Sequence, residues 1–576
     1  MKLSSKFKSL NYLSSLIKND TSIGIGGHHF ARLPIALINN LLNKNPKNLE
    51  FISWSGGLAL ELFLQKNAVN KIQICFSSLD IFGLAPLFRK TCENKTIEVI
   101  DWSALGLIKA LRAGQQNIDS EIFQYPWGSD LPIKTKFCKK FKDPISKNHF
   151  AIVPSLKIDN FLLHASRADE DGNVEILGPR ALDTIMAGAS KQVIVTVDEV
   201  VSRDVLAREK KGSLISKNFV KAIAHVPYGA YPTSSVPYYI TDYEDLKNAF
   251  LKTPLNIGTS FKKNRQFITK SNKLNSKYFK NYLSKNYRNS KNKEKVTSDE
   301  IMAFALANEY DDKSLCSSGA VSPLANVSYF LAKKLHAPKL ILTTMTYGHH
   351  DVSFRPMTLS FSEVLDRETC INFWGGDDSY SIYYQNGQIT HEVIGAAQID
   401  KYGDVNNIEI KKKSGGILRL PGQGGMADVS NLHQHFIGYV TKHSKLSFVE
   451  KVDYVSAGRG LFKDKERLRA GLKPGHVKIF TNLCIFEKNK KTGLLEVISI
   501  HKGVTKEEIQ NNTSFKVKYK KGCKITKMPT TSQLNVLRNI VDPLNIRKLE
   551  FTSGEERIKL LEEIIKKEKN LIKSLN

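Results

Sequence analysis

The sequence has no long apolar run and no pattern of paired cysteines. None of its apolar stretches approaches the roughly 18 residues that a membrane-spanning helix needs, so a membrane protein is not expected. The seven cysteines are scattered and form no Cys-x-x-Cys pair, which argues against a structural zinc site and a disulfide framework. Residues 1–8 are basic but lack the apolar core and cleavage site of a secretory signal. These absences favour a soluble, cytoplasmic protein.

Acidic residues are scarce relative to basic ones: 56 Asp and Glu stand against 85 Lys and Arg, a net charge of +29. A basic surface attracts nucleic acid without regard to its sequence. However, Lys and Asn are abundant throughout, and twelve Lys or Arg with one Glu are concentrated in residues 261–296. We interpret that run as a solvated connector and expect no specific nucleic-acid partner.

The chain of 576 residues is long enough for several domains. Short β-branched runs alternate with longer helical patterns, which is typical of a mainly parallel sheet with helices on both faces. Ligands of such α/β folds gather at the carboxyl ends of the strands. The expected strands are residues 71–76, 152–154, 161–165, 192–197 and 339–344, and the expected helices are residues 36–42, 104–112, 181–189 and 327–335.

An amphipathic helix is predicted at the C-terminus. Residues 553–556 (SGEE) have capping-box spacing, and apolar residues then recur at helical intervals. The recurring residues are Ile558, Leu561, Ile564, Ile565 and Leu571. We expect this helix to pack on the domain or on a neighbouring copy of the chain rather than on a membrane.

Glycine-rich segments occur in both halves of the chain. Residues 22–34 (SIGIGGHHFARLP) run from an apolar strand through glycines into a helix pattern. The second half carries three segments in order: 393–400 (VIGAAQID), 402–406 (YGDVN) and 421–428 (PGQGGMAD). Glycines let backbone N–H groups approach a ligand closely. The predicted ligand-binding residues are Gly26, Gly27, His28, Arg32, Gly395, Gln398, Gly422, Gln423, Gly424 and Gly425.

At these residues the chain resembles the family I CoA-transferases, specifically the glutaconate type, whose α and β subunits are usually separate polypeptides. The resemblance implies two tandem α/β domains, an α-like one (1–255) and a β-like one (298–552), joined by a connector (256–297) and followed by a helix (553–576). It also implies an acyl-CoA substrate, no permanently bound cofactor and no metal. The fused chain would supply both sides of its own cleft and could also form a homodimer.

One position departs from the family pattern. In the family, a glutamate in a Glu-Ser-Gly or Glu-Asn-Gly motif attacks the thioester, as nucleophile and then leaving group. Alignment of Gly348 with the family glycine puts Thr346 there, and a hydroxyl cannot replace the carboxylate. The acids Glu363 and Glu392 fall at other points of the pattern, and a misplaced gap is the alternative reading.

We therefore expect hydrolytic ring opening or carbon–carbon cleavage of a CoA thioester, as in relatives that have lost the glutamate. Three alternatives stay open. They are true CoA transfer through an unrecognised carboxylate, decarboxylation of a glutaconyl-type CoA ester, and binding of acyl-CoA without catalysis.

The ring-opening relatives use a carboxylate of the α half, and the local candidates are Glu98 and Asp101. On a strand these two point to opposite faces. Asp101 is favoured because it precedes Ser103, where a helix pattern begins, although a carboxylate near a helix N-terminus also has a structural explanation.

Other polar residues have two readings each. Arg32 could pair with a substrate carboxylate or form a structural salt bridge. His28 and His349 could act as acid or base, or only line the cleft. The loop from Gly422 to Gly425 is predicted to form an oxyanion hole over the thioester carbonyl.

Overall fold

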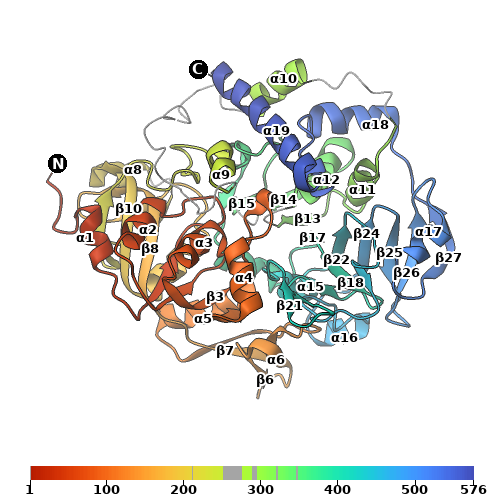
Figure 1. The fold of residues 1–576 in the computed structure, drawn as a ribbon, viewed down its shortest axis with the longest axis horizontal. Coiled ribbons are helices and arrows are strands. Elements are labelled where there is room, and N and C mark those ends of the chain that lie inside the picture. Colours follow the sequence, from red (N-terminus) through yellow and green to blue (C-terminus); the bar gives the residue numbers. More distant parts are fainter. Residues whose placement is uncertain are drawn as a thin grey trace.

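The computed structural model describes residues 2–209, 212–250, 276–287, 295–319, 322–344 and 348–575. Each half of the chain is built on one large sheet, and the two halves lie side by side (Figure 1). The prediction of mainly parallel sheets flanked by helices is confirmed. Most of the predicted connector, residues 256–297, lies outside the described residues.

The sheet of the first half has nine strands, of which seven neighbours run parallel in the order β12-β10-β8-β1-β2-β3-β4. These strands are β1 (Ser22–Ile25), β2 (Leu49–Ile52), β3 (Val69–Ile74), β4 (Glu98–Asp101), β8 (Ile158–Asp169), β10 (Ser190–Val201) and β12 (Val220–His225). Strands β9 (Val174–Ile176) and β11 (Ser213–Ile215) add an antiparallel edge, and β5 (Ser120–Gln124), β6 (Lys139–Lys142) and β7 (His149–Pro154) form a separate small sheet. The helices include α2 (Ile35–Leu42), α3 (Gly57–Gln65), α4 (Pro86–Asn94), α5 (Ala104–Gln116), α7 (Asp183–Gly188) and α9 (Tyr243–Phe250).

The sheet of the second half has ten strands, and its centre, β14-β13-β17-β22-β24, is parallel. These strands are β13 (Leu315–Ser318), β14 (Ile341–Thr344), β17 (His391–Gly395), β22 (Phe436–Val440) and β24 (Val477–Thr481). Antiparallel β15 (His349–His350) and β16 (Asn372–Phe373) extend one edge, and β25 (Cys484–Lys488), β26 (Leu495–Ile500) and β27 (Lys518–Ile525) extend the other. The helices include α11 (Ser298–Ala307), α12 (Pro323–Leu335), α13 (Ser362–Thr369), α15 (Met426–Leu432), α16 (Asp464–Arg469), α17 (Lys506–Asn511) and α18 (Thr531–Val536).

Local sequence signals explain several element boundaries. The Ser103 hydroxyl accepts a hydrogen bond from the backbone N–H of Gly106 (3.0 Å), which caps α5 where the sequence predicts a helix start. Thr297 and Glu300 form a capping box on α11. Strand β8 is almost wholly buried, as expected for a strand with both faces covered.

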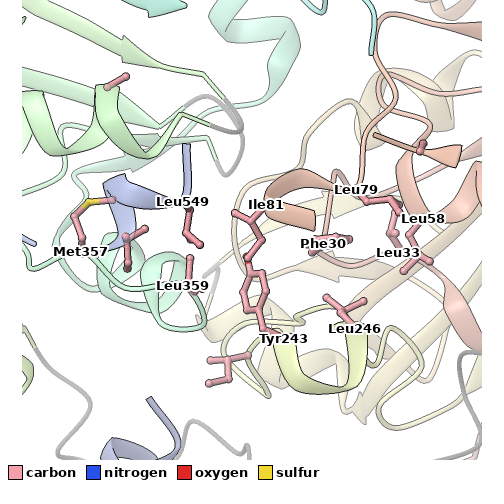
Figure 2. Close-up of a cluster of buried hydrophobic side chains, with 14 of the residues drawn as sticks. Phe30, Leu33, Leu58, Leu79, Ile81, Tyr243, Leu246, Met357, Leu359 and Leu549 are labelled. Atoms are coloured by element: carbon pink, nitrogen blue, oxygen red, sulfur yellow. The ribbon is translucent and has the colours of Figure 1, made fainter. Parts of the chain in front are cut away.

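The two halves share one apolar core. Phe30, Ile81 and Tyr243 of the first half belong to the same buried cluster as Leu359 and Leu549 of the second half (Figure 2). The side chains from the two halves approach one another across this junction. Burial of this apolar surface is the main force that holds the halves together.

The C-terminal helix α19 (Gly554–Leu575) spans the junction (Figure 1). The Glu568 carboxylate accepts hydrogen bonds from the backbone N–H groups of Leu359 (2.6 Å) and Ser360 (3.0 Å), whereas Lys247 of α9 reaches Glu562 at 2.9 Å. The predicted apolar residues Leu561, Ile564, Ile565 and Leu571 are buried. Ile558 is not: it is 40% exposed.

A short helix from the basic connector, α10 (Ser276–Asn286), packs on α19. The Tyr278 hydroxyl donates to the Ser574 hydroxyl (2.9 Å), and the Phe279 ring contacts Phe361 edge-on at 4.6 Å between centroids. This part of the connector therefore belongs to the fold. No helix within the described ranges is both long and apolar enough to cross a membrane.

Candidate functional site

A cavity of about 540 Å³ lies between the two halves, at the carboxyl ends of β1, β13, β17 and β22. The first half contributes His28, which follows β1, and Trp54, which follows β2. The second half contributes Gly319 after β13 and residues 395–397 at the end of β17. A volume of roughly 300–1,000 Å³ is typical of small-molecule sites, so the cavity can enclose the reacting part of a substrate.

The two adjacent histidines of the first loop have different surroundings. The His28 ring stacks on Trp54 at 4.4 Å, and burial holds its pKa well below the usual value, so it is neutral. Its Nδ1 has no hydrogen-bond partner among the described residues. The Nδ1 of His29 instead lies 2.6 Å from Asp80 Oδ1. Both histidines line the cavity, and of the two it is His29 that has a carboxylate partner.

The other predicted residues of this loop support its backbone and do not line the cavity. The N–H of Gly27 donates to Asp183 Oδ1 (2.9 Å), and that of Gly26 donates to the Leu162 carbonyl (2.9 Å). Arg32 is buried, and its Nη2 forms an ion pair with Asp183 Oδ2 (2.8 Å). Of the two predictions for Arg32, the structural salt bridge is the one that its geometry matches. Gly26, Gly27 and Arg32 were predicted to bind the ligand, but none of the three lines the cavity.

In the second half, Asn407 joins two of the predicted glycine-rich segments. Its Nδ2 donates to the Gly395 carbonyl (2.8 Å), its Oδ1 accepts from the Ala397 N–H (2.7 Å), and its backbone carbonyl accepts from the Gly422 N–H (2.9 Å). Asn407 and both segments line the cavity. Gln398 does not, because its amide binds the Leu446 carbonyl and Asn406.

The loop 422–425 forms one wall of the cavity, and half of its backbone donors are already used. The N–H of Gly422 binds Asn407, and that of Gly424 binds the Cys75 carbonyl (2.8 Å). The Gln423 side chain is also used: it donates to the Trp102 carbonyl (2.6 Å). Within the described part of the chain, the backbone N–H groups of Gln423 and Gly425 have no partner. These two amides are the donors that an oxyanion hole would use.

Glu392 is a buried carboxyl group in the cavity wall. Its Oε2 accepts a hydrogen bond from the Tyr384 hydroxyl (3.2 Å) and lies 3.7 Å from His433 Nδ1. Its Oε1 faces Gly319, 3.6 Å from the point where a Cβ of that glycine would stand. Burial raises the pKa of Glu392 to about 8, against the opposing effect of hydrogen bonds from Ser317 and Tyr384.

The sheet register relates Glu392 to the strand that leads to residue 346. Ser317 of β13 pairs with Glu392 of β17 on one side and with Thr343 of β14 on the other. Adjacent strands are about 4.8 Å apart, so the backbones of Glu392 and Thr343 are roughly 10 Å apart across the sheet. The sequence does not single out Glu392 because it lies outside the family motif, although an acid next to the buried apolar residues Val393 and Ile394 is a signal.

Three of the predicted catalytic residues, Asp101, Glu98 and His349, do not line this cavity. Asp101 is held by Arg419, whose Nη1 and Nη2 bind its two carboxylate oxygens at 2.8 and 2.5 Å. Glu98 is exposed on the same strand, on the opposite face as predicted. His349 is buried and bonded to Thr344, and Thr346 lies outside the described residues.

The helix N-terminus near Asp101 is occupied by a different carboxylate. Asp428 Oδ2 accepts from the Leu105 N–H (2.9 Å), at the start of α5. Asp101 is therefore neither a cavity residue nor the cap of that helix. Across the described residues, no group of three or more His, Cys, Asp or Glu side chains is arranged to hold a metal ion.

Comparison with known proteins gives a consistent result. Residues 9–225 and 300–512 each match the model of the Coenzyme A transferase family. One of the two polypeptides of the 3-oxoadipate CoA-transferase of Pseudomonas knackmussii is 28% identical over 246 residues, which cover 42% of this chain and 92% of that polypeptide. One polypeptide of the glutaconate CoA-transferase of Acidaminococcus fermentans is 26% identical over 263 residues, covering 42% of this chain and 79% of that polypeptide.

One hydrolase and one single-chain structure are also similar. The IpdB polypeptide of the cholesterol ring-cleaving hydrolase of Mycobacterium bovis is 27% identical over 264 residues, covering 45% of this chain and 99% of that polypeptide. The structure of acyl-CoA transferase YdiF from Escherichia coli O157:H7 superposes with a TM-score of 0.66 at 15% identity, covering 96% of this chain and 98% of that one. The latter similarity concerns the fold: both chains carry the two halves in one polypeptide.

Proposed function

Because the chain belongs to the Coenzyme A transferase family, we propose that it acts on an acyl-CoA thioester by hydrolytic ring opening or carbon–carbon cleavage rather than by CoA transfer. The observation that carries the proposal is Glu392. A nucleophile of the transfer reaction must be ionised, whereas a carboxyl group with a pKa near 8 is mostly protonated at neutral pH. Such a group suits proton transfer.

The proposed reaction assigns one role to each part of the cavity. Neutral His28 takes a proton from water, whose oxygen bonds to a ketone carbon of the acyl group. The adjacent carbon–carbon bond then breaks, and its electron pair moves onto the carbon next to the thioester, as an enolate. The N–H groups of Gln423 and Gly425 stabilise the enolate oxygen. Glu392 delivers the proton that completes the carbon, and one new carboxylic acid and one shorter or opened CoA thioester result.

True CoA transfer is the second candidate, because Glu392 is a carboxyl group inside the cavity. In that reaction the same residue would have to ionise and form an anhydride and then a glutamyl-CoA thioester. The first candidate is favoured by the alignment that puts Thr346 at the position of the family nucleophile. Decarboxylation would use the same enolate-stabilising amides. Release of carbon dioxide distinguishes it from ring opening and from CoA transfer.

Product analysis with a matched pair of variants tests the proposal. Purified protein is incubated with a panel of straight-chain and cyclic β-keto acyl-CoA thioesters, with and without an acceptor acid. We expect turnover that needs no acceptor and that Glu392→Gln lowers roughly 100- to 10,000-fold. Glu363→Gln is the control, because Glu363 is a buried carboxyl with a pKa raised to about 7 that does not line the cavity. An obligatory acceptor acid would instead establish transfer.

A further inference from the structure

We propose that Arg557 binds an anionic group of the substrate, either a carboxylate at the far end of the acyl chain or a phosphate of CoA. Arg557 lies in the first turns of α19, beyond residue 512 where the family match ends. Among the described residues that line the cavity, it is the single Lys or Arg. The inference rests on the proposed function, since it takes the ligand to be an acyl-CoA.

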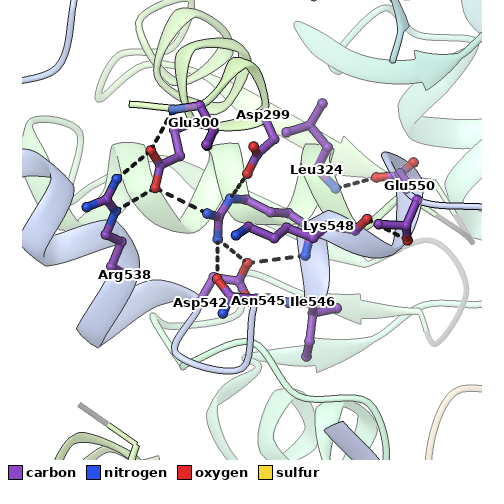
Figure 3. A network of polar contacts seen from close by, with 12 residues as sticks. Asp299, Glu300, Leu324, Arg538, Asp542, Asn545, Ile546, Lys548 and Glu550 are labelled. Carbon is purple, nitrogen blue, oxygen red and sulfur yellow. Dashed lines mark hydrogen bonds and ion pairs between the residues drawn. The ribbon is translucent and has the colours of Figure 1, made fainter. Parts of the chain in front are cut away.

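The segment before Arg557 is rigidly held. Buried Arg547 pairs with Asp542 (2.8 Å) and Asp299 (2.8 Å), which ties the short helix Ile546–Glu550 to α11 (Figure 3). At the end of that helix, Glu550 Oε2 accepts from the Leu324 N–H (2.6 Å) and its Oε1 accepts from the Tyr439 hydroxyl. Both oxygens of Glu550 are therefore occupied, and the residue is fixed in the cavity wall.

The guanidinium of Arg557 is left without a direct partner. It is half-buried, and no hydrogen bond or ion pair to its side chain is found in the described part of the chain. Burial lowers its pKa, and the nearby charge of Glu550 opposes that shift without a direct ion pair. A partly desolvated cation without a partner is costly, and an incoming anion removes that cost.

The chemistry of the side chain indicates the kind of ligand. A guanidinium presents donors in a planar fork that matches the two oxygens of a carboxylate or phosphate. Both groups are available in a substrate of this class: CoA carries phosphates, and a dicarboxylic acyl group carries a second carboxylate. A purely apolar monocarboxylic acyl group offers only the phosphates.

Titration calorimetry with four probes distinguishes these sources: glutaryl-CoA, valeryl-CoA, free CoA and pantetheine. Arg557→Ala is compared with Lys559→Ala, an exposed charge loss on the same helix. We expect Arg557→Ala to weaken binding of glutaryl-CoA roughly ten- to hundredfold while Lys559→Ala does not. Arg557→Lys, which keeps the charge but not the fork, should fall between them.

The pattern across probes identifies the anion. If valeryl-CoA and free CoA weaken as much as glutaryl-CoA and pantetheine is unaffected, Arg557 binds a phosphate; if only glutaryl-CoA weakens, it binds the acyl carboxylate. Equal affinities of Arg557→Ala and Lys559→Ala for all four probes overturn the inference. A wild-type protein that binds no CoA compound would overturn the proposed function itself. Thermal melts establish whether each variant is folded. If Arg557→Ala is not folded, the comparison is made with Arg557→Lys.

Discussion

The two glycine-rich loops, 26–32 in the first half and 422–425 in the second, each contain a pair of adjacent glycines but have different surroundings. In the first loop, Asp183 takes up the Gly27 N–H and the Arg32 side chain, so the glycines serve the fold. In the second loop, the Gln423 and Gly425 amides remain without a partner within the described residues and line the cavity. A glycine-rich sequence thus permits another group to approach the backbone closely. Whether that group is a ligand or another part of the protein depends on the rest of the fold.

Of changes to the two loops, the largest effect is expected from Gly425→Ala. A Cβ at this position would lie 1.8 Å from the Tyr380 hydroxyl oxygen, and Tyr380 itself lines the cavity. The displaced tyrosine and loop should lower kcat/KM about 100-fold or more, because misplacement of a catalytic group by about 1 Å has that effect. Steady-state kinetics measures it, and circular dichroism checks the fold. Gly178→Ala, where nothing lies within 4 Å of the new Cβ, is the control.

A change to Asp183, which binds the first loop, should affect stability instead of catalysis. Asp183→Asn breaks a buried ion pair and leaves Arg32 with an uncompensated charge, so the free energy of unfolding should fall by about 3–5 kcal/mol. Denaturant unfolding measures this loss. The KM of the protein that remains folded should not change, and a raised KM at full stability would instead make Arg32 a substrate-binding residue.

The smallest expected effect is the pH dependence that Glu392 brings to the cavity. If its protonated form is required, the rate should fall as pH rises through about 8. A carboxyl whose folded pKa lies above its unfolded value keeps its proton longer in the folded state. Protonated Glu392 therefore stabilises the folded protein most at pH values below the pKa that it has in the unfolded chain. This stabilisation is lost as the pH rises from that unfolded pKa to about 8. Glu392→Gln should remove both dependences, and a profile unchanged by it would exclude Glu392 as the titrating group.

The sequence predicts the fold well because the signals are local. Alternation of strand and helix patterns predicts the parallel sheets, and residues 104–112 fall inside α5 as expected. Ile558 shows the limit, since helical spacing identifies an apolar stripe but not which of its residues the rest of the fold covers.

The site was harder to predict because it depends on contacts between distant residues. Asp101 looks like a candidate base until Arg419, 318 residues away, neutralises it. Gly27 binds Asp183, 156 residues away. Glu392 directly precedes the glycine-rich segment 393–400, but it and Arg557 become cavity residues because β17 and α19 are brought together with the first half.

The most direct test of the central claim is mass spectrometry of the intact protein after incubation with acyl-CoA thioesters and then with borohydride or hydroxylamine. Non-transfer chemistry predicts no enzyme–CoA adduct together with opened or cleaved CoA products. A trapped glutamyl-CoA adduct, above all at Glu392, would contradict it and establish CoA transfer.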